Sequence, residues 1–143
     1  MSTWVTDADN GVRIERLITT YRENQVGAAD PSYLDLVTVK TVSYLRYDTN
    51  TLIQLRYPNW KLADDGTNFA RGDKVVTPNT IRGTLVSRFK QWEEQGLVEN
   101  INQFKKDLIV ERDKNDPNRI NAIIPPDIIN NLRVFAGLLQ FRL

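Results

Sequence analysis

The residues best suited to hold a metal ion lie in a short run of acids and amides in the C-terminal half. Asp113, Asn115, Asp116 and Asn118 offer side-chain oxygens of the kind that calcium prefers. Their spacing lacks the central glycine and the closing glutamate of an EF-hand loop, so a plain turn explains them better. The triplet Asp64-Asp65-Gly66 pairs two acids, but this composition is also typical of a turn. The sequence therefore predicts no metal site.

Catalytic chemistry is restricted by two residue types that the chain lacks, histidine and cysteine. Their absence excludes thiolate nucleophiles, Cys/His zinc sites and a Ser-His-Asp triad. A hydrolase with two carboxylates stays open, because it needs only two acids on either side of a substrate cleft. The glutamates that could serve are Glu15, Glu93, Glu94, Glu99 and Glu111. None lies in a recognisable motif, so we predict a protein that is not an enzyme and needs no cofactor.

Length and composition favour one soluble domain. The 143 residues suit a single core, and 41% hydrophobic with 26% charged residues is ordinary for soluble protein. The formal net charge of +1 creates no strong field toward nucleic acid. The N-terminal residues do not resemble a signal peptide, and no apolar run approaches the roughly 20 residues of a membrane helix. We therefore expect no nucleic-acid partner and no membrane anchor.

The N-terminal half of the chain predicts an arm, a strand and a long helix. Residues 1–10 are polar and lack a period, which indicates an extended arm. Residues 12–20 follow as a strand, because alternate positions are mostly apolar. Asp30-Pro31 is typical of a helix start, and apolar residues at helical spacing carry this helix to about Tyr57. The poor helix formers at positions 48–51 leave a kink or a break open there.

A second helix is predicted from Pro78, with Thr77 as its capping residue and Gly96 as its stop. Its apolar stripe consists of Ile81, Leu85, Phe89 and Trp92, at spacings of four, four and three. Such spacing places these side chains on one face of the helix, toward a core. The opposite face carries polar and charged residues.

The C-terminal part of the chain predicts strands. Residues 108–112 and 119–124 flank the turn-forming residues 114–118, which indicates a hairpin. The final run is apolar at both parities from Val134 to Leu139, so a strand there would need cover on both faces. That cover would come from the same chain or from another subunit, and the pattern alone leaves both open.

These elements together predict an α+β fold. We expect a small mixed sheet with two main helices on one face, an N-terminal arm over residues 1–10 and a domain over residues 11–143. The predicted strands of this sheet are Val12–Thr20, Leu108–Arg112, Arg119–Ile124 and Val134–Leu143. The predicted core consists of Leu34, Val37, Leu45, Leu85, Phe89 and Trp92.

Five stretches, in their order along the chain, resemble the C-terminal domain of tail sheath proteins of the Mu-like phage family. They are Val12–Thr20; Asp30–Tyr47; Arg56-Tyr57-Pro58 with Lys61–Gly66; Val76-Thr77-Pro78 through Gly96–Asn100; and Asp107–Arg112 through Asp116–Arg119 to Phe141-Arg142-Leu143. The resemblance covers nearly the whole chain from Gly11. It implies a longer parent protein with further, outer domains before this one, so that the chain is a fragment of that protein.

The resemblance also implies a structural role in a contractile phage tail. Proteins of this family form a helical stack of hexameric rings around a tail tube and contract to drive the tube into the host. The implied partners are other sheath subunits, the tail tube protein, and baseplate and tail terminator proteins. The implied location is the virion, assembled in the cytoplasm of the bacterial host.

Two sets of candidate residues follow. The resemblance implies that chain termini add strands to the sheets of neighbouring subunits. The candidates for this intersubunit strand pairing are Val12, Ile14, Gln140, Phe141, Arg142 and Leu143. The candidate tube-facing residues are Arg88, Lys90, Lys105 and Lys106. For these four cations the plainer alternative is a solvated surface, which is common for such charges.

A winged-helix-like nucleic-acid-binding module is the alternative function. Two helices, then Gly96-Leu97-Val98-Glu99 and a hairpin, occur in the order of that fold, and the helix from Pro78 would be the reading helix. This helix offers few basic groups, whereas phosphate contacts usually need a clear basic excess. The sequence therefore favours the sheath interpretation.

Overall fold

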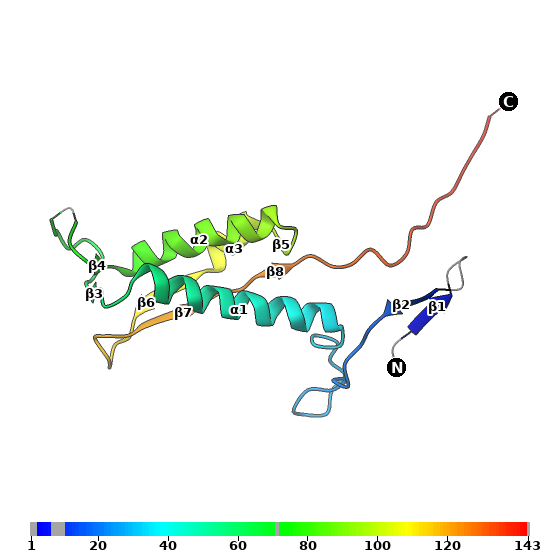
Figure 1. Cartoon of the computed structure of the whole chain (residues 1–143), viewed down its shortest axis with the longest axis horizontal. Helices are drawn as coiled ribbons and strands as arrows, with labels where there is room; N and C mark the ends of the chain where they lie inside the picture. The colour runs from blue at the N-terminus through cyan, green and yellow to red at the C-terminus, as the bar shows by residue number, and fades with distance from the viewer. Residues whose placement is uncertain (1–2, 7–10, 71, 143) are drawn as a thin grey trace.

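The chain forms an elongated helical body, and two extended arms leave this body at the same end (Figure 1). This computed structural model describes residues 3–6, 11–70 and 72–142. The helices are α1 (Leu36–Arg56), α2 (Pro78–Glu94) and α3 (Ile101–Asp107). The strands are β1 (Thr3–Thr6), β2 (Val12–Arg16), β3 (Lys61–Leu62), β4 (Val75–Val76), β5 (Val98–Glu99), β6 (Ile109–Arg112), β7 (Ile120–Ile123) and β8 (Asp127–Ile128). The predicted α+β class is confirmed.

Helix α1 begins after Asp35, later than the predicted start at Asp30-Pro31. The predicted start is wrong because Asp30 makes a turn instead: its carboxylate accepts from the Ser32 N–H at 2.9 Å and from the Tyr21 hydroxyl at 2.7 Å. The helix then runs to Arg56 without a break. The polar residues at 48–51 do not interrupt it: the Thr49 hydroxyl donates back to the Leu45 carbonyl at 2.7 Å, and Asp48 is bonded to Arg88 and Trp92 of α2.

Helix α2 has the predicted bounds. The Thr77 hydroxyl accepts from the Thr80 N–H at 3.3 Å, and Pro78 occupies the first turn, where it needs no intrahelical partner. Gly96 follows the C-terminus with φ +71°, a conformation that glycine adopts without strain. The short helix α3 was not predicted; it begins after Asn100, which lies in the left-handed region.

The hydrophobic core lies between α2, α3 and the adjoining strands. It consists of Leu45, Val76, Ile81, Leu85, Phe89, Trp92, Val98, Phe104 and Leu108. The rings of Phe89 and Phe104 are stacked with their centroids 4.0 Å apart, so α3 supplies a central part of this core. Of the predicted core, Leu45, Leu85, Phe89 and Trp92 are confirmed, whereas Leu34 is only partly buried. Val37 is 48% exposed, so its assignment to the core is wrong.

Asp48 joins α1 to α2. Its carboxylate accepts from Arg88 Nε at 2.6 Å and from Trp92 Nε1 at 2.8 Å, and Arg88 Nη2 makes a second contact with the other oxygen. The Arg88 guanidinium, helped by the Trp92 N–H, holds the pKa of Asp48 below its ordinary value. A residue that the sequence marks as a poor helix former is therefore the polar link between the two main helices.

The strands do not form the predicted single mixed sheet. In the described parts of the chain they form four separate two-stranded ladders: β1–β2, β5–β8 and β6–β7 are antiparallel, and β3–β4 is parallel. The predicted hairpin around residues 114–118 is confirmed as β6–β7. Its turn is closed by Asp113, whose Oδ1 accepts from the N–H groups of Asn115 and Asp116.

The predicted final strand is also wrong for the residues that the structure describes. Residues 129–142 follow β8 as an extended segment that belongs to no ladder. The physical reason is that no neighbouring strand runs beside it: in Figure 1 the segment leaves the helical body and ends far from it. In the same described residues, no helix is long and apolar enough to cross a membrane.

Candidate assembly surface

The N-terminal arm is a β-hairpin. Strand β2 pairs antiparallel with β1, so that Val12 lies opposite Thr6 and Ile14 lies opposite Trp4. The described part of the predicted arm, Thr3–Thr6, is therefore extended, as expected, but pairs with β2 of its own chain. The side chains of Trp4, Val12 and Ile14 are exposed. The hairpin thus carries apolar side chains that its own chain leaves uncovered.

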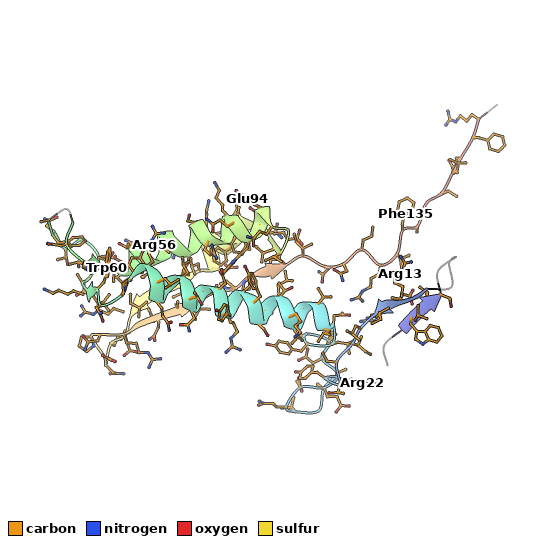
Figure 2. The ribbon with its side chains drawn as sticks, viewed as in Figure 1. Arg13, Arg22, Arg56, Trp60, Glu94 and Phe135 are labelled. Carbon is orange, nitrogen blue, oxygen red and sulfur yellow. The ribbon has the colours of Figure 1, made fainter. Side chains whose placement is uncertain are left out.

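The C-terminal arm, defined here as residues 129–142, is more exposed. Six of its large apolar residues are between 78% and 93% exposed, namely Leu132, Val134, Phe135, Leu138, Leu139 and Phe141. Gln140 and Arg142 are exposed as well, and the predicted pairing residue Leu143 lies outside the described residues. Figure 2 shows the side chain of Phe135 on this arm, away from the helical body. Exposed apolar patches of this kind usually mark an interaction site.

The two arms meet at Asp35, the residue before α1. Arg16 at the end of β2 donates from Nε to Asp35 Oδ1 at 3.0 Å and from Nη2 to Oδ2 at 3.3 Å. Arg133 of the C-terminal arm places Nη2 2.6 Å from Asp35 Oδ2. These two guanidinium groups, Arg16 first, lower the pKa of the Asp35 carboxyl. We call these three residues the Asp35 clamp.

Backbone contacts hold the N-terminal arm at the same point. The Leu36 N–H donates to the Leu17 carbonyl at 3.1 Å, and the Thr19 N–H donates to the Leu34 carbonyl at 2.7 Å. The C-terminal arm begins where the Ile129 N–H donates to the Leu97 carbonyl at 3.2 Å. Both arms are therefore attached to the body, and Asp35 lies between them.

A groove of about 910 Å³ separates the two arms. One wall is formed by residues 13–17 of the hairpin and the other by residues 131–134 of the C-terminal arm, with Asp35 and Val37 at the base. Strand β2 has a ladder partner on one side only within the described residues. An extended segment is the kind of ligand that such a groove suits, because it can pair with a strand edge and place alternate side chains in the groove.

The four candidate tube-facing cations occupy different environments. Arg88 is committed to Asp48 and also donates to Gln91 at 2.6 Å, so it holds α2 to α1. Lys90 on α2 and Lys105 and Lys106 on α3 are exposed. On α2, which would be the reading helix of a winged-helix module, Arg88 is engaged with Asp48, and Arg82 donates to the carbonyls of Lys105 and Leu108. The described residues give the winged-helix alternative no support.

No cluster of three or more acids able to hold a metal ion occurs in the described residues. The acidic run at 113–118, considered above as a calcium loop, uses its oxygens internally. Asp113 caps the turn, and its Oδ2 accepts from Asn121 Nδ2 at 2.8 Å. Asp116 Oδ1 accepts from the Asn118 N–H at 2.9 Å, so both acids of the run take part in hydrogen bonds of the turn.

Comparison with known proteins identifies the family of this chain. The model of the phage tail sheath C-terminal domain matches residues 28–142. The chain belongs to the phage tail sheath family. It is also 41% identical over 141 residues to the Mu-like prophage FluMu tail sheath protein of Haemophilus influenzae. That alignment covers 99% of this chain but 29% of the relative, so the chain spans less than a third of that sheath protein's length.

Sequence reasoning selected both arms but missed the clamp between them. Asp35 lies in the stretch Asp30–Tyr47 that carries the family resemblance, but it was expected inside a helix, and Arg133 directly precedes the predicted strand Val134–Leu143. The ion pairs join three parts of the chain that are remote in sequence. The signal that could have found part of the clamp is Arg133, a single charge between Leu132 and Val134, because such charges tend to have partners. Arg16 gives no such signal, because Arg13 and Glu15 lie beside it in the sequence.

Proposed function

We propose that this chain is an assembly domain of a contractile tail sheath, and that its two arms link each sheath subunit to its neighbours by strand pairing. The observation that carries this proposal is the C-terminal arm: six large apolar side chains lie exposed on a segment that has no ladder partner among the described residues. A second subunit would cover them and complete the ladder. Backbone hydrogen bonds then supply the strength of the joint, and alternate side chains set its register.

Such a joint suits a sheath whose subunits move relative to each other during contraction. An arm added to a neighbour's sheet makes a heterologous contact, which builds open helical assemblies rather than closed dimers. An extended linker also lets helical bodies rotate while the paired strands stay together. In this proposal Val12 and Ile14 lie in the receiving hairpin, and Gln140, Phe141, Arg142 and Leu143 lie in the donated strand.

Further partners belong to the same proposal. The sheath would surround a tail tube and end at baseplate and terminator proteins, in a virion assembled in the bacterial cytoplasm. Lys90, Lys105 and Lys106 are exposed, and charge reversal at these positions tests whether they contact the tube. Arg88 is a poor probe, because its reversal would also break the link to Asp48.

The decisive experiment uses the full-length sheath protein that contains this domain. Wild-type protein should form hollow tubes in negative-stain electron micrographs. Deletion of residues 1–10 or of residues 140–143 should abolish the tubes while far-UV circular dichroism shows a folded protein. If both truncated proteins still form normal tubes, strand exchange by the arms is wrong, and the contacts between subunits must lie on the helical bodies.

A further inference from the structure

One carboxylate contacts both arms. Arg16 and Arg133 contact the same side chain, Asp35, and Arg133 reaches the oxygen that Arg16 Nη2 also uses. The two guanidinium groups are thereby held close to each other. Without the intervening negative charge they would repel, since like charges at this spacing in a partly exposed site interact unfavourably.

The position of Asp35 strengthens this dependence. Asp35 precedes the first turn of α1, where the helix dipole disfavours cations. Its side chain makes no hydrogen bond to the helix N-terminus, so its oxygens serve the two arginines instead. Neutralising Asp35 would therefore leave two cations facing each other near a positive helix end.

We propose that Asp35 is a positioning residue for both arms, and that the Asp35 clamp sets the width of the groove in which a second copy of this chain lays an extended segment. The two walls of the groove come from the two arms, and Arg16 and Arg133 each lie in one wall. The clamp thus fixes the walls relative to each other before the partner arrives. Preorganisation of this kind raises affinity, because less order must be gained on binding.

The choice of a second copy rests on the proposed strand exchange and on the surface chemistry of the groove. Ile14 in one wall and Leu132 and Val134 in the other are exposed apolar side chains. The C-terminal arm of another copy offers apolar side chains at both parities. It can therefore face such walls on both sides while its backbone pairs with β2.

The clamp can be tested in the isolated chain, which has no native cysteine. Spin labels at Val12→Cys and Phe135→Cys, one on each arm, report the distance between the arms by double electron–electron resonance. The parent should give a narrow distance distribution. Asp35→Asn should remove the narrow component and shift the distribution to longer distances, and Arg133→Gln should do the same. Asp35→Glu, which keeps the charge, should recover a part of the narrow component.

The matched control is Glu94→Gln, which neutralises an exposed carboxylate at the C-terminal end of α2, outside the Asp35 clamp (Figure 2). It should leave the distribution unchanged. Thermal unfolding of each variant shows that the helical body is intact. A broad distribution in the parent, or an unchanged narrow one in a folded Asp35→Asn variant, would overturn the clamp.

Tube assembly by the full-length protein distinguishes failure of the Asp35 clamp from failure of the proposed strand exchange, on which the clamp's role rests. If the truncations abolish tubes but Asp35→Asn changes neither the distance distribution nor the tubes, strand exchange stands and the clamp is wrong. If the truncations leave tubes intact, strand exchange is wrong whatever the distances show. If both proposals hold, the full-length Asp35→Asn protein loses most of its tubes although its arms are present.

Discussion

Apolar side chains are buried in the core of the helical body and exposed in the two arms. In the body, Phe89, Trp92 and Val98 are almost completely covered by their own chain. In the C-terminal arm, Phe135, Leu139 and Phe141 have nearly their whole surface in solvent. The body therefore holds what it needs for its own stability, while the arm carries apolar surface whose burial requires another molecule.

The ion pairs of the body and of the arms also differ in how far they are shielded from water. The Asp48–Arg88 pair lies between two packed helices and is shielded from water on most sides. The Asp35 clamp is more exposed and joins the two arms, each of which is also attached to the body by backbone hydrogen bonds. The first pair should contribute to the free energy of unfolding, whereas the second should affect mainly the geometry of the arms.

The largest predicted effect is the loss of Trp92. This side chain is 1% exposed and donates to Asp48, so Trp92→Ala leaves a cavity and an unpaired acceptor. We expect a destabilisation of about 3–5 kcal/mol, measured by urea denaturation. Trp4→Ala is the matched control, because Trp4 on β1 is 65% exposed and should change the unfolding free energy little. Equal effects of the two substitutions would contradict the division into body and arms.

The next effect in size is the loss of the helix–helix ion pair. Asp48→Ala leaves Arg88 and the Trp92 N–H without their acceptor, and a cost of about 2–3 kcal/mol is expected. This is less than for a fully buried pair, because Arg88 keeps some contact with water. Asp64→Ala breaks an exposed pair with Arg112 and should cost at most about 1 kcal/mol. A larger loss for Asp64→Ala than for Asp48→Ala would reverse this ranking.

A smaller and pH-dependent effect follows from the same pair. Because Arg88 lowers the pKa of Asp48 in the folded state, Asp48 contributes stability at pH values above its unfolded pKa of about 3.9. This contribution is lost as the pH falls through the lower, folded pKa, where the carboxylate becomes protonated. Between pH 7 and pH 2, Asp48→Asn should therefore lose less stability than the wild type. Parallel stability curves for the two proteins would show that Asp48 is not responsible.

How far the sequence could predict the structure depends on the range of the interactions. The bounds of α2 follow from Thr77, Pro78 and Gly96, and the β6–β7 turn follows from Asp113 and its neighbours, all of them local signals. The start of α1 was misplaced because Asp30 contacts Tyr21, in a different segment.

Features formed by remote residues escaped prediction for the same reason. The Asp35 clamp joins three distant segments, so no window of sequence contains it. The final run was predicted as a strand from its apolar pattern, but a strand also needs a neighbour beside it. The apolar pattern predicts surface that needs cover, and the described part of the chain leaves that surface exposed.

The smallest predicted effect on the body comes from the arm that is most exposed. Leu138→Ser with Leu139→Ser removes apolar surface that nothing in the described chain covers, so the unfolding free energy should change by no more than about 0.5 kcal/mol. The same pair of substitutions in the full-length protein should prevent tubes, because a polar arm gains little on burial against a neighbour. Val26→Ser is the control: Val26 is equally exposed, but it lies in the loop before α1 and should leave tubes and stability unchanged. If Leu138→Ser with Leu139→Ser lowered the unfolding free energy about as much as Trp92→Ala, the arm would pack on its own body. It would then not be available to a neighbour.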